Sequence, residues 1–288
     1  MTSPRISASS YSNTAPLVWS FLYGSRRGSA ELILDTAPAR SAELLSQQGV
    51  TAALVPVIAF QTIPGVRLVP DVCVGARERV RSVCLVTRGM ELKDVRSVAL
   101  DVSSRTSVTL TKIIFREFLG VEPEFKPAEP NIERMLADSD CALLIGDPAL
   151  SLSICDLQFA IEEPDLFAGQ DQLQFGNRKL QIRVFDLVEL WRRFTGFGFV
   201  FAMWMSALES VAIDFAGARD EGLDHLDEII ANYESEIRLP GDEFRDYLST
   251  NISYSVDDQM QKGLELFFDL ARRNRLIEAN RPLAFVTR

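Results

Sequence analysis

Hydroxyl, amide and arginine side chains gather at the ends of four predicted strands. These four segments are residues 9–14, 35–40, 101–107 and 146–148. Ligands of open parallel sheets bind beyond the carboxyl ends of the strands, where helix amino termini present unpaired N–H groups. Arginine holds a carboxylate through two parallel hydrogen bonds, and Ser or Thr hydroxyls can complete such a site. The pattern therefore predicts a cleft that binds a small molecule with carboxylates.

A simpler interpretation applies to each segment on its own. Ser, Thr, Asp and Asn are the ordinary residues that cap helix amino termini, and the two arginines could project into water. Asp147 precedes Pro148 and could either bind a ligand hydroxyl or fix a turn. Four such segments at one cleft favour the binding interpretation, whereas the two roles of Asp147 stay open.

Residues for conventional acid–base or metal chemistry are scarce. His225 is the only histidine, and it lies in an acidic helical stretch far along the chain from the four segments. We expect it to be solvated or partly packed, so a Ser-His-Asp triad is not predicted. The dispersed cysteines are expected to be reduced, buried thiols: Cys73, Cys84, Cys141 and Cys155. Without a cluster of metal-ligand residues or a phosphate-binding glycine loop, no metal and no cofactor are expected.

The composition excludes several classes of partner. The net charge is −10, so broad binding to nucleic acid is not expected. The most apolar stretch, residues 197–208, is shorter than the roughly 20 residues of a membrane helix, so no membrane span is predicted. The amino-terminal residues have no apolar run after their charge, which favours a cytoplasmic protein.

The first half of the chain alternates short apolar runs with helical patterns, which is typical of a parallel sheet flanked by helices. The predicted strands are 5–9, 31–34, 52–55, 97–100 and 142–145. The predicted helices between them are 14–23, 39–47, 106–119 and 131–137. The expected fold class is therefore α/β.

Two further apolar stretches, 80–87 and 199–205, are predicted to be long strands on either side of a middle segment. A chain that leaves one lobe and later returns to it needs two such crossings. We therefore predict a discontinuous first lobe, residues 1–88 plus 200–288. The second lobe, residues 89–199, is inserted into it.

The second half of the chain carries fewer signals. Asp186 and Glu189 resemble a capping arrangement that opens a helix, and Gly196 is placed to end it. Helical spacing predicts a buried stripe near the carboxyl end, at Met260, Leu264, Phe267 and Ala271. Residues 151–179 are polar and poorly periodic, so they are predicted to form an irregular surface excursion.

Four ordered stretches of the sequence resemble a known family. They are SYSNTAPL at 10–17, VRSV at 80–83, ALDVSSRTS at 99–107 and ALLIGDPAL at 142–150. Together with WRRFTGFGFVFAMW at 191–204, they are similar to the chorismate dehydratases of the futalosine route to menaquinone. The resemblance implies the two-lobed fold of type II periplasmic binding proteins. It also implies a lyase that removes water from chorismate to give 3-(1-carboxyvinyloxy)benzoate.

The same resemblance carries the family's active-site asparagine onto Asn13. An amide cannot act as an acid or base near neutral pH, so its implied role is hydrogen bonding and orientation, while formation of an aromatic ring drives the reaction. The resemblance implies that the ring and enolpyruvyl carboxylates are held by Arg40, Ser82, Ser104, Arg105 and Thr106. Ser103 and Asp147 complete the candidate substrate-binding residues. Ser12 departs from the pattern, because the family often has leucine there.

Two alternatives stay open. One is a cytoplasmic protein that binds a small carboxylate ligand without converting it. The other is the sister enzyme of the same pathway, which makes a dihydroxynaphthoate, although the predicted cleft segments contain no counterpart of an active-site histidine. The expected partner is chorismate. The oligomeric state stays open, with a homodimer as one possibility.

Overall fold

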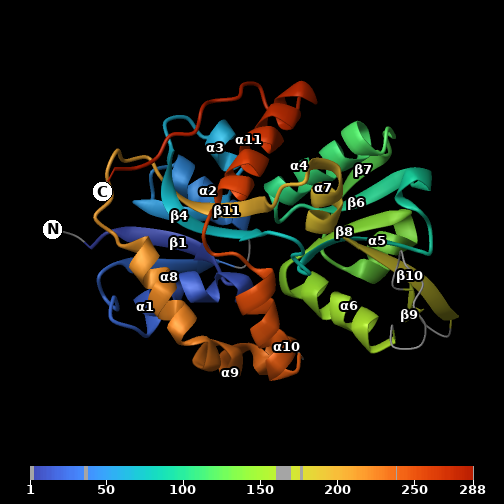
Figure 1. Cartoon of the computed structure of the whole chain (residues 1–288), viewed down its shortest axis with the longest axis horizontal. Helices are drawn as coiled ribbons and strands as arrows, with labels where there is room; N and C mark the ends of the chain where they lie inside the picture. The colour runs from blue at the N-terminus through green and yellow to red at the C-terminus, as the bar shows by residue number, and fades with distance from the viewer. Residues whose placement is uncertain (1–2, 36–37, 160–169, 176–177, 238, 288) are drawn as a thin grey trace.

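Two α/β lobes lie side by side in the computed structural model of the chain (Figure 1). The structure describes residues 3–35, 38–159, 170–175, 178–237 and 239–287. Within these ranges, one lobe contains a five-stranded sheet and the other a six-stranded sheet. The predicted two-lobed α/β class is confirmed.

The first sheet is built from both ends of the chain, in the strand order β2-β1-β3-β11-β4. Its strands are β1 Arg5–Ser9, β2 Glu31–Asp35, β3 Ala52–Pro56, β4 Arg67–Ala76 and β11 Phe199–Ser206. β1 pairs in parallel with β2 and β3, whereas β11 runs antiparallel to β3 and β4. Every residue of β3 is buried, because a central strand covered on both faces needs a continuous apolar run.

The second sheet has the strand order β7-β6-β8-β5-β10-β9. Its strands are β5 Val83–Thr87, β6 Ser97–Asp101, β7 Glu124–Ala128, β8 Cys141–Ile145, β9 Gln170–Phe175 and β10 Arg178–Asp186. β6 is parallel to β7 and β8, whereas β5 is antiparallel to β8 and β10. The five strands predicted for the first half of the chain begin and end within one residue of the observed strands.

Helices and short helical turns connect the strands. The helices are α1 Ala15–Leu22, α2 Pro38–Ser46, α3 Ala59–Thr62, α4 Arg105–Ile113, α5 Ile132–Asp138, α6 Gly146–Phe159, α7 Leu187–Thr195, α8 Phe215–Asp224, α9 Leu226–Ile237, α10 Gly241–Asp246 and α11 Asp258–Arg273. The turns are η1 Ser12–Thr14, η2 Leu92–Asp94, η3 Ile114–Phe118 and η5 Tyr247–Asn251. None of the helices in the described ranges combines the length and the apolar character needed to cross a membrane.

The chain passes between the two sheets twice. It leaves β4 after Ala76 and enters the second sheet at Val83, and it returns from α7 to the first sheet at Phe199. The strand predicted over 199–205 is confirmed, since β11 covers it. The first lobe is thus discontinuous.

The strand predicted over 80–87 is wrong in its first three residues. Arg81 has a left-handed backbone with φ of 62°, and the N–H groups of Val80 and Arg81 donate to Asp186 Oδ2 at 3.0 and 2.6 Å instead of to a strand. β5 therefore begins at Val83 and lies wholly in the second sheet. The lobe boundaries, 1–88 plus 200–288 and 89–199, stay a prediction.

The prediction of an irregular excursion over 151–179 is wrong for the described residues 151–159, 170–175 and 178–179. α6 extends to Phe159, and β9 and β10 form an antiparallel hairpin at the edge of the second sheet. β10 joins this sheet through main-chain pairing with β5, and its partner β9 has the mostly polar sequence QDQLQF, which concealed the hairpin. Residues 160–169 lie outside the described part of the chain.

Signals for helix ends and buried faces are confirmed. The Asp186 carboxylate accepts hydrogen bonds from the N–H groups of Val188 and Glu189, at 2.8 and 3.2 Å, and Gly196 ends α7 with φ of 79°. The predicted stripe on α11 is buried: Met260, Leu264, Phe267 and Ala271. Three cysteines are free, buried thiols, namely Cys73, Cys84 and Cys141, whereas the side chain of Cys155 lies outside the described residues.

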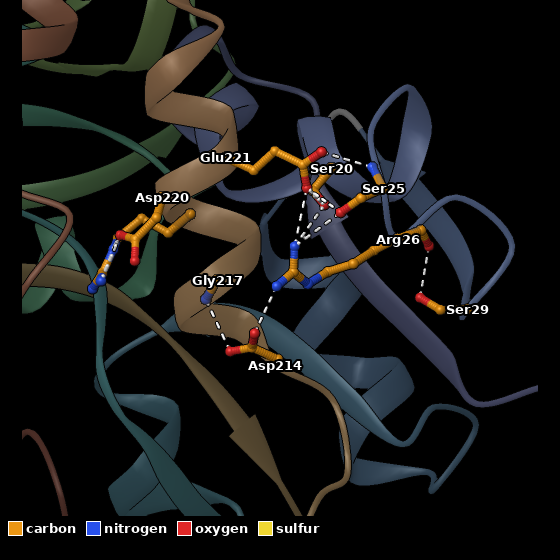
Figure 2. Close-up of polar contacts among 9 residues, drawn as sticks. Ser20, Ser25, Arg26, Ser29, Asp214, Gly217, Asp220 and Glu221 are labelled. Carbon is orange, nitrogen blue, oxygen red and sulfur yellow. Dashed lines mark hydrogen bonds and ion pairs between the residues drawn. The ribbon is translucent and has the colours of Figure 1, made fainter.

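A polar clasp fixes α8 against the end of α1 (Figure 2). The Glu221 carboxylate accepts hydrogen bonds from Ser20 Oγ at 2.5 Å, and from both the N–H and the hydroxyl of Ser25 at 2.7 Å. Arg26 bridges Glu221 and Asp214, with N···O distances of 3.0 and 2.6 Å. Because α1 follows directly on the loop after β1, the clasp also holds that loop.

The clasp predicts a loss of stability in acid. The hydrogen bonds from Ser20 and Ser25 lower the pKa of Glu221 to about 2, below its value of about 4.3 in an unfolded chain. The carboxylate therefore stabilises the fold above about pH 4.3, and this contribution is lost as the pH falls toward 2. Glu221→Gln should flatten the fall of Tm between pH 4 and pH 2 in scanning calorimetry. Glu265→Gln, on the surface of α11, is the control, and identical pH slopes in the two variants would contradict the assignment.

Candidate active site between the lobes

A pocket lies between the lobes. It is lined by the loop after β1, by β3, β4 and β11, by the crossing before β5, and by the carboxyl end of β8 and the first turn of α4. The lining residues are Ser9, Tyr11, Asn13, Thr14, Leu54, Pro56, Val74, Val80, Ser82, Val83, Ser104, Ser107, Ile145, Gly146, Phe201 and Ala202. Three of the four polar segments thus reach one cavity, whereas no described residue of 35–40 lines it.

The loop after β1 is held by hydrogen bonds from Thr14 to main-chain carbonyl groups, and it places Asn13 in the pocket wall. Thr14 Oγ1 donates to the carbonyl oxygens of Ser9 and Tyr11 at 2.6 and 2.8 Å, and the Thr14 N–H donates to Tyr11 O at 2.9 Å. Asn13 is buried, with 9% of its surface exposed. An amide offers two donors and an acceptor but does not exchange protons near neutral pH, so this side chain can orient a ligand.

The first turn of α4 presents two hydroxyls to the pocket. Ser104 caps the helix, since its Oγ accepts from the N–H of Ser107 at 3.4 Å, and both residues line the cavity. Thr106 lies behind them, fully buried, where its Oγ1 accepts from the N–H of Ile58 in the first lobe at 3.2 Å. The amino terminus of α4 is therefore docked on the opposite lobe and favours negative charge in the cavity.

Tyr11 and Asp101 are linked through Ser103. The N–H and the hydroxyl of Ser103 both donate to Asp101 Oδ1, the N–H at 3.0 Å. Burial raises the pKa of Asp101, whose Oδ2 is buried without a hydrogen bond to the described residues. Burial also raises the pKa of Tyr11, while the neighbouring Ser103 side chain lowers it. The phenol in the pocket wall therefore stays protonated near neutral pH and acts as a donor.

Ser12 and Asp147 join the two lobes. The Ser12 hydroxyl hydrogen-bonds Asp147 Oδ1, and the Ser12 N–H donates to Oδ2 at 3.3 Å. Gly146 begins α6 with φ of 65°, and a Cβ built there would lie 3.0 Å from the Tyr11 ring, so the loop after β1 packs directly on this turn. Ser12, the position where this chain departs from the family pattern, thus supplies an interlobe contact.

The predicted site residues fall into three groups. Those that line the pocket are Asn13, Ser82 and Ser104. Those that bond protein groups around it are Ser103, Thr106 and Asp147. Those that are exposed and outside its lining are Arg40 and Arg105.

Neither predicted arginine reaches the pocket. Arg40 lies on the solvent face of α2 and pairs with Glu43 at 2.5 Å, one turn further along the helix. Arg105 opens α4, but the following two residues take the buried side of that turn, which leaves Arg105 exposed. Both arginines lie outside the pocket lining, and their candidate role in holding the carboxylates stays a prediction.

Sequence reasoning missed two tyrosines. Tyr11 lies two residues before Asn13, in the stretch 10–17 that resembles the known family, so this stretch was the signal that could have identified it. Tyr247, in η5, is fully buried, and burial raises the pKa of its hydroxyl, whereas nearby Ser82 and Asn13 side chains lower it. No local pattern marks Tyr247, because it reaches the site from more than 200 residues further along the chain than Asn13.

His225 lies away from the pocket. Its ring stacks on Trp19 with a centroid distance of 3.9 Å, and its Nδ1 lies 2.8 Å from Glu221 O. The expectation of a partly packed histidine is confirmed. In the described ranges, no three His, Cys, Asp or Glu side chains come together as a metal site would require.

Comparison with known proteins identifies the family. A family model described as menaquinone biosynthesis matches residues 4–273, which span both lobes. The chain belongs to this menaquinone biosynthesis family. One relative of this chain is the chorismate dehydratase of Thermus thermophilus. The two are 32% identical over 266 residues, which cover 89% of this chain and 91% of the relative.

Solved structures similar to this menaquinone biosynthesis protein support the fold alone. A protein from Archaeoglobus fulgidus aligns with a TM-score of 0.63 at 11% identity, covering 95% of this chain and 98% of that one. The periplasmic aliphatic sulphonate binding protein of Escherichia coli aligns with a TM-score of 0.59 at 17% identity, covering 99% and 94%. A Candida albicans protein with the generic periplasmic binding protein fold gives 0.61 at 12%, covering 100% and 98%. The predicted periplasmic-binding-protein-like fold is confirmed.

The contact between Ser12 and Asp147 predicts a measurable contribution to stability. Ser12→Ala removes the hydroxyl bond to a partly buried carboxylate and should lower the free energy of unfolding by about 1–2 kcal/mol in urea denaturation. The matched control is Ser46→Ala, because the Ser46 hydroxyl bonds only a main-chain carbonyl of its own helix, at 3.2 Å. Equal losses in the two variants would show that the interlobe bond adds nothing.

Proposed function

We propose that this protein is a lyase that dehydrates chorismate to 3-(1-carboxyvinyloxy)benzoate. The observation that carries the proposal is the 32% identity to the chorismate dehydratase of Thermus thermophilus over 266 residues. The pocket agrees with it, since a helix amino terminus and several hydroxyls favour an anionic ligand there. The substrate class is therefore a doubly acidic ring compound held between the lobes.

The reaction removes one molecule of water from the substrate. The ring carbon that carries the enolpyruvyl ether loses its proton, the adjacent carbon loses its hydroxyl, and the electrons of the broken C–H bond complete an aromatic ring. Aromatisation supplies the driving force, so the enzyme needs to position the substrate and stabilise developing charge more than to supply a strong base.

The pocket chemistry fits this requirement. Among the described lining residues, Tyr11 is the one with a titratable side chain, and burial raises its pKa, so it stays protonated and donates a hydrogen bond instead of acting as a base. The ring proton then leaves to water or to a carboxylate of the substrate itself. Asn13 orients the reacting ring, and Ser82 and Ser104 hold the carboxylates.

The direct test mixes purified protein with chorismate and follows product by chromatography and ultraviolet absorbance. We expect chorismate to disappear as the aromatic product forms. Binding without conversion would instead establish the alternative, a protein that captures a carboxylate ligand, and formation of a dihydroxynaphthoate from its cyclised precursor would establish the sister enzyme. The futalosine route and a cytoplasmic location stay predictions of the sequence.

Asn13→Ala tests the role of the amide. Loss of one positioned donor should lower kcat about 100- to 1,000-fold while the product still binds in calorimetry. Asn280→Ala is the control, because that amide bonds Asp269 and Gln61 and does not line the pocket. Full turnover in the Asn13 variant would remove it from the catalytic residues.

A further inference from the structure

The carboxylates of a bound substrate need a positive charge, and the exposed Arg40 and Arg105 do not reach the pocket lining. Arg81 is a different case. It lies in the crossing between β4 and β5, flanked by Val80 and Ser82, which both line the cavity. Its side chain is 6% exposed, which makes it a buried cation next to the pocket.

The guanidinium of Arg81 is incompletely paired. Its Nε and Nη2 are buried without a hydrogen bond to the described residues. The nearest carboxylate oxygen, Glu243 Oε2, is 3.6 Å away, beyond hydrogen-bond length, and is itself buried without a hydrogen bond. The main chain of Arg81 is fixed, because its N–H donates to Asp186 at 2.6 Å and its φ is 62°. The Arg81 guanidinium is therefore fixed in position, and it can still stabilise an anion.

Two hydroxyls, those of Ser82 and Tyr247, lie near each other and near Arg81. Ser82 Oγ lines the pocket and Tyr247 Oη lies close to it, and both atoms are buried without a hydrogen bond of standard geometry to the described residues. Tyr247 is rigidly mounted, since its ring stacks on Phe244 at a centroid distance of 6.2 Å. Buried donors without partners cost free energy unless a ligand or an ordered water accepts from them.

We infer that Ser82 and Tyr247 donate to one carboxylate of the bound dicarboxylate, and that the Arg81 guanidinium behind them stabilises its charge. The inference rests on the proposed function for the identity of the ligand. Tyr247 is thereby a substrate-binding residue, and Arg81 is a positioning residue that acts through the field at this end of the pocket. Glu243 opposes it, because its negative charge offsets that of Arg81.

The test measures the dissociation constant of 3-(1-carboxyvinyloxy)benzoate by calorimetry in three variants. Tyr247→Phe removes the hydroxyl and keeps the ring, so affinity should fall roughly 10- to 100-fold, the effect of a hydrogen bond to a charged group. Tyr254→Phe is the matched control, because the Tyr254 hydroxyl is also buried without a hydrogen bond to the described residues, but the pocket residues Ser82 and Asn13 act on Tyr247 and not on Tyr254. Its affinity should match that of the parent.

Glu243→Gln supplies a readout that a structural role would not move. Removing the charge that opposes Arg81 should tighten binding by roughly two- to fivefold. Equal affinities in the Tyr247 and Tyr254 variants, or unchanged or weaker binding in the Glu243 variant, would overturn the inference. This experiment measures binding, so its outcome does not depend on turnover. A parent protein that binds the product but leaves chorismate unchanged would refute the lyase proposal, and the binding comparison would still decide the inference.

Discussion

The part of the pocket that joins the two lobes is held by contacts between the first lobe and the first turns of α4 and α6. Ser12 bonds Asp147, Tyr11 packs on Gly146, and Thr106 accepts from a main-chain N–H of the opposite lobe. Each contact pairs a polar or close-packed group that would otherwise face an open gap. Together they bring Asn13 and Ser104 into one wall, although 91 positions separate them in the chain.

The same contact sets the electrostatics of the site. The pocket excludes carboxylate side chains from its described lining, keeps Tyr11 protonated through burial, and receives the amino terminus of α4. Such a cavity binds negative charge and orients it but offers little proton transfer of its own. That combination suits a dehydration whose driving force is aromatisation within the substrate, and it gives Asn13 an orienting role.

Most of the fold could be predicted from the sequence, because the strands of the first half are short apolar runs bounded by clear turn residues. The edge hairpin β9–β10 could not, since the sequence of β9, QDQLQF, is mostly polar. At the site, the local string around Asn13 and the cap at Ser104 were readable. The exposure of Arg40 and Arg105 could not be predicted, because the direction of a helix side chain depends on which face of the helix packs against the rest of the protein. Tyr247 was equally invisible, since it arrives from a distant segment.

The most direct measurement is a crystal structure of the protein with 3-(1-carboxyvinyloxy)benzoate bound. We expect the aromatic ring between the loop after β1 and the first turn of α4, with the Asn13 amide and the Ser104 hydroxyl both within hydrogen-bond distance of the ligand. Both lobes should contact it. A ligand held by one lobe alone, or bound outside this pocket with the Asn13 amide untouched, would contradict the interlobe site.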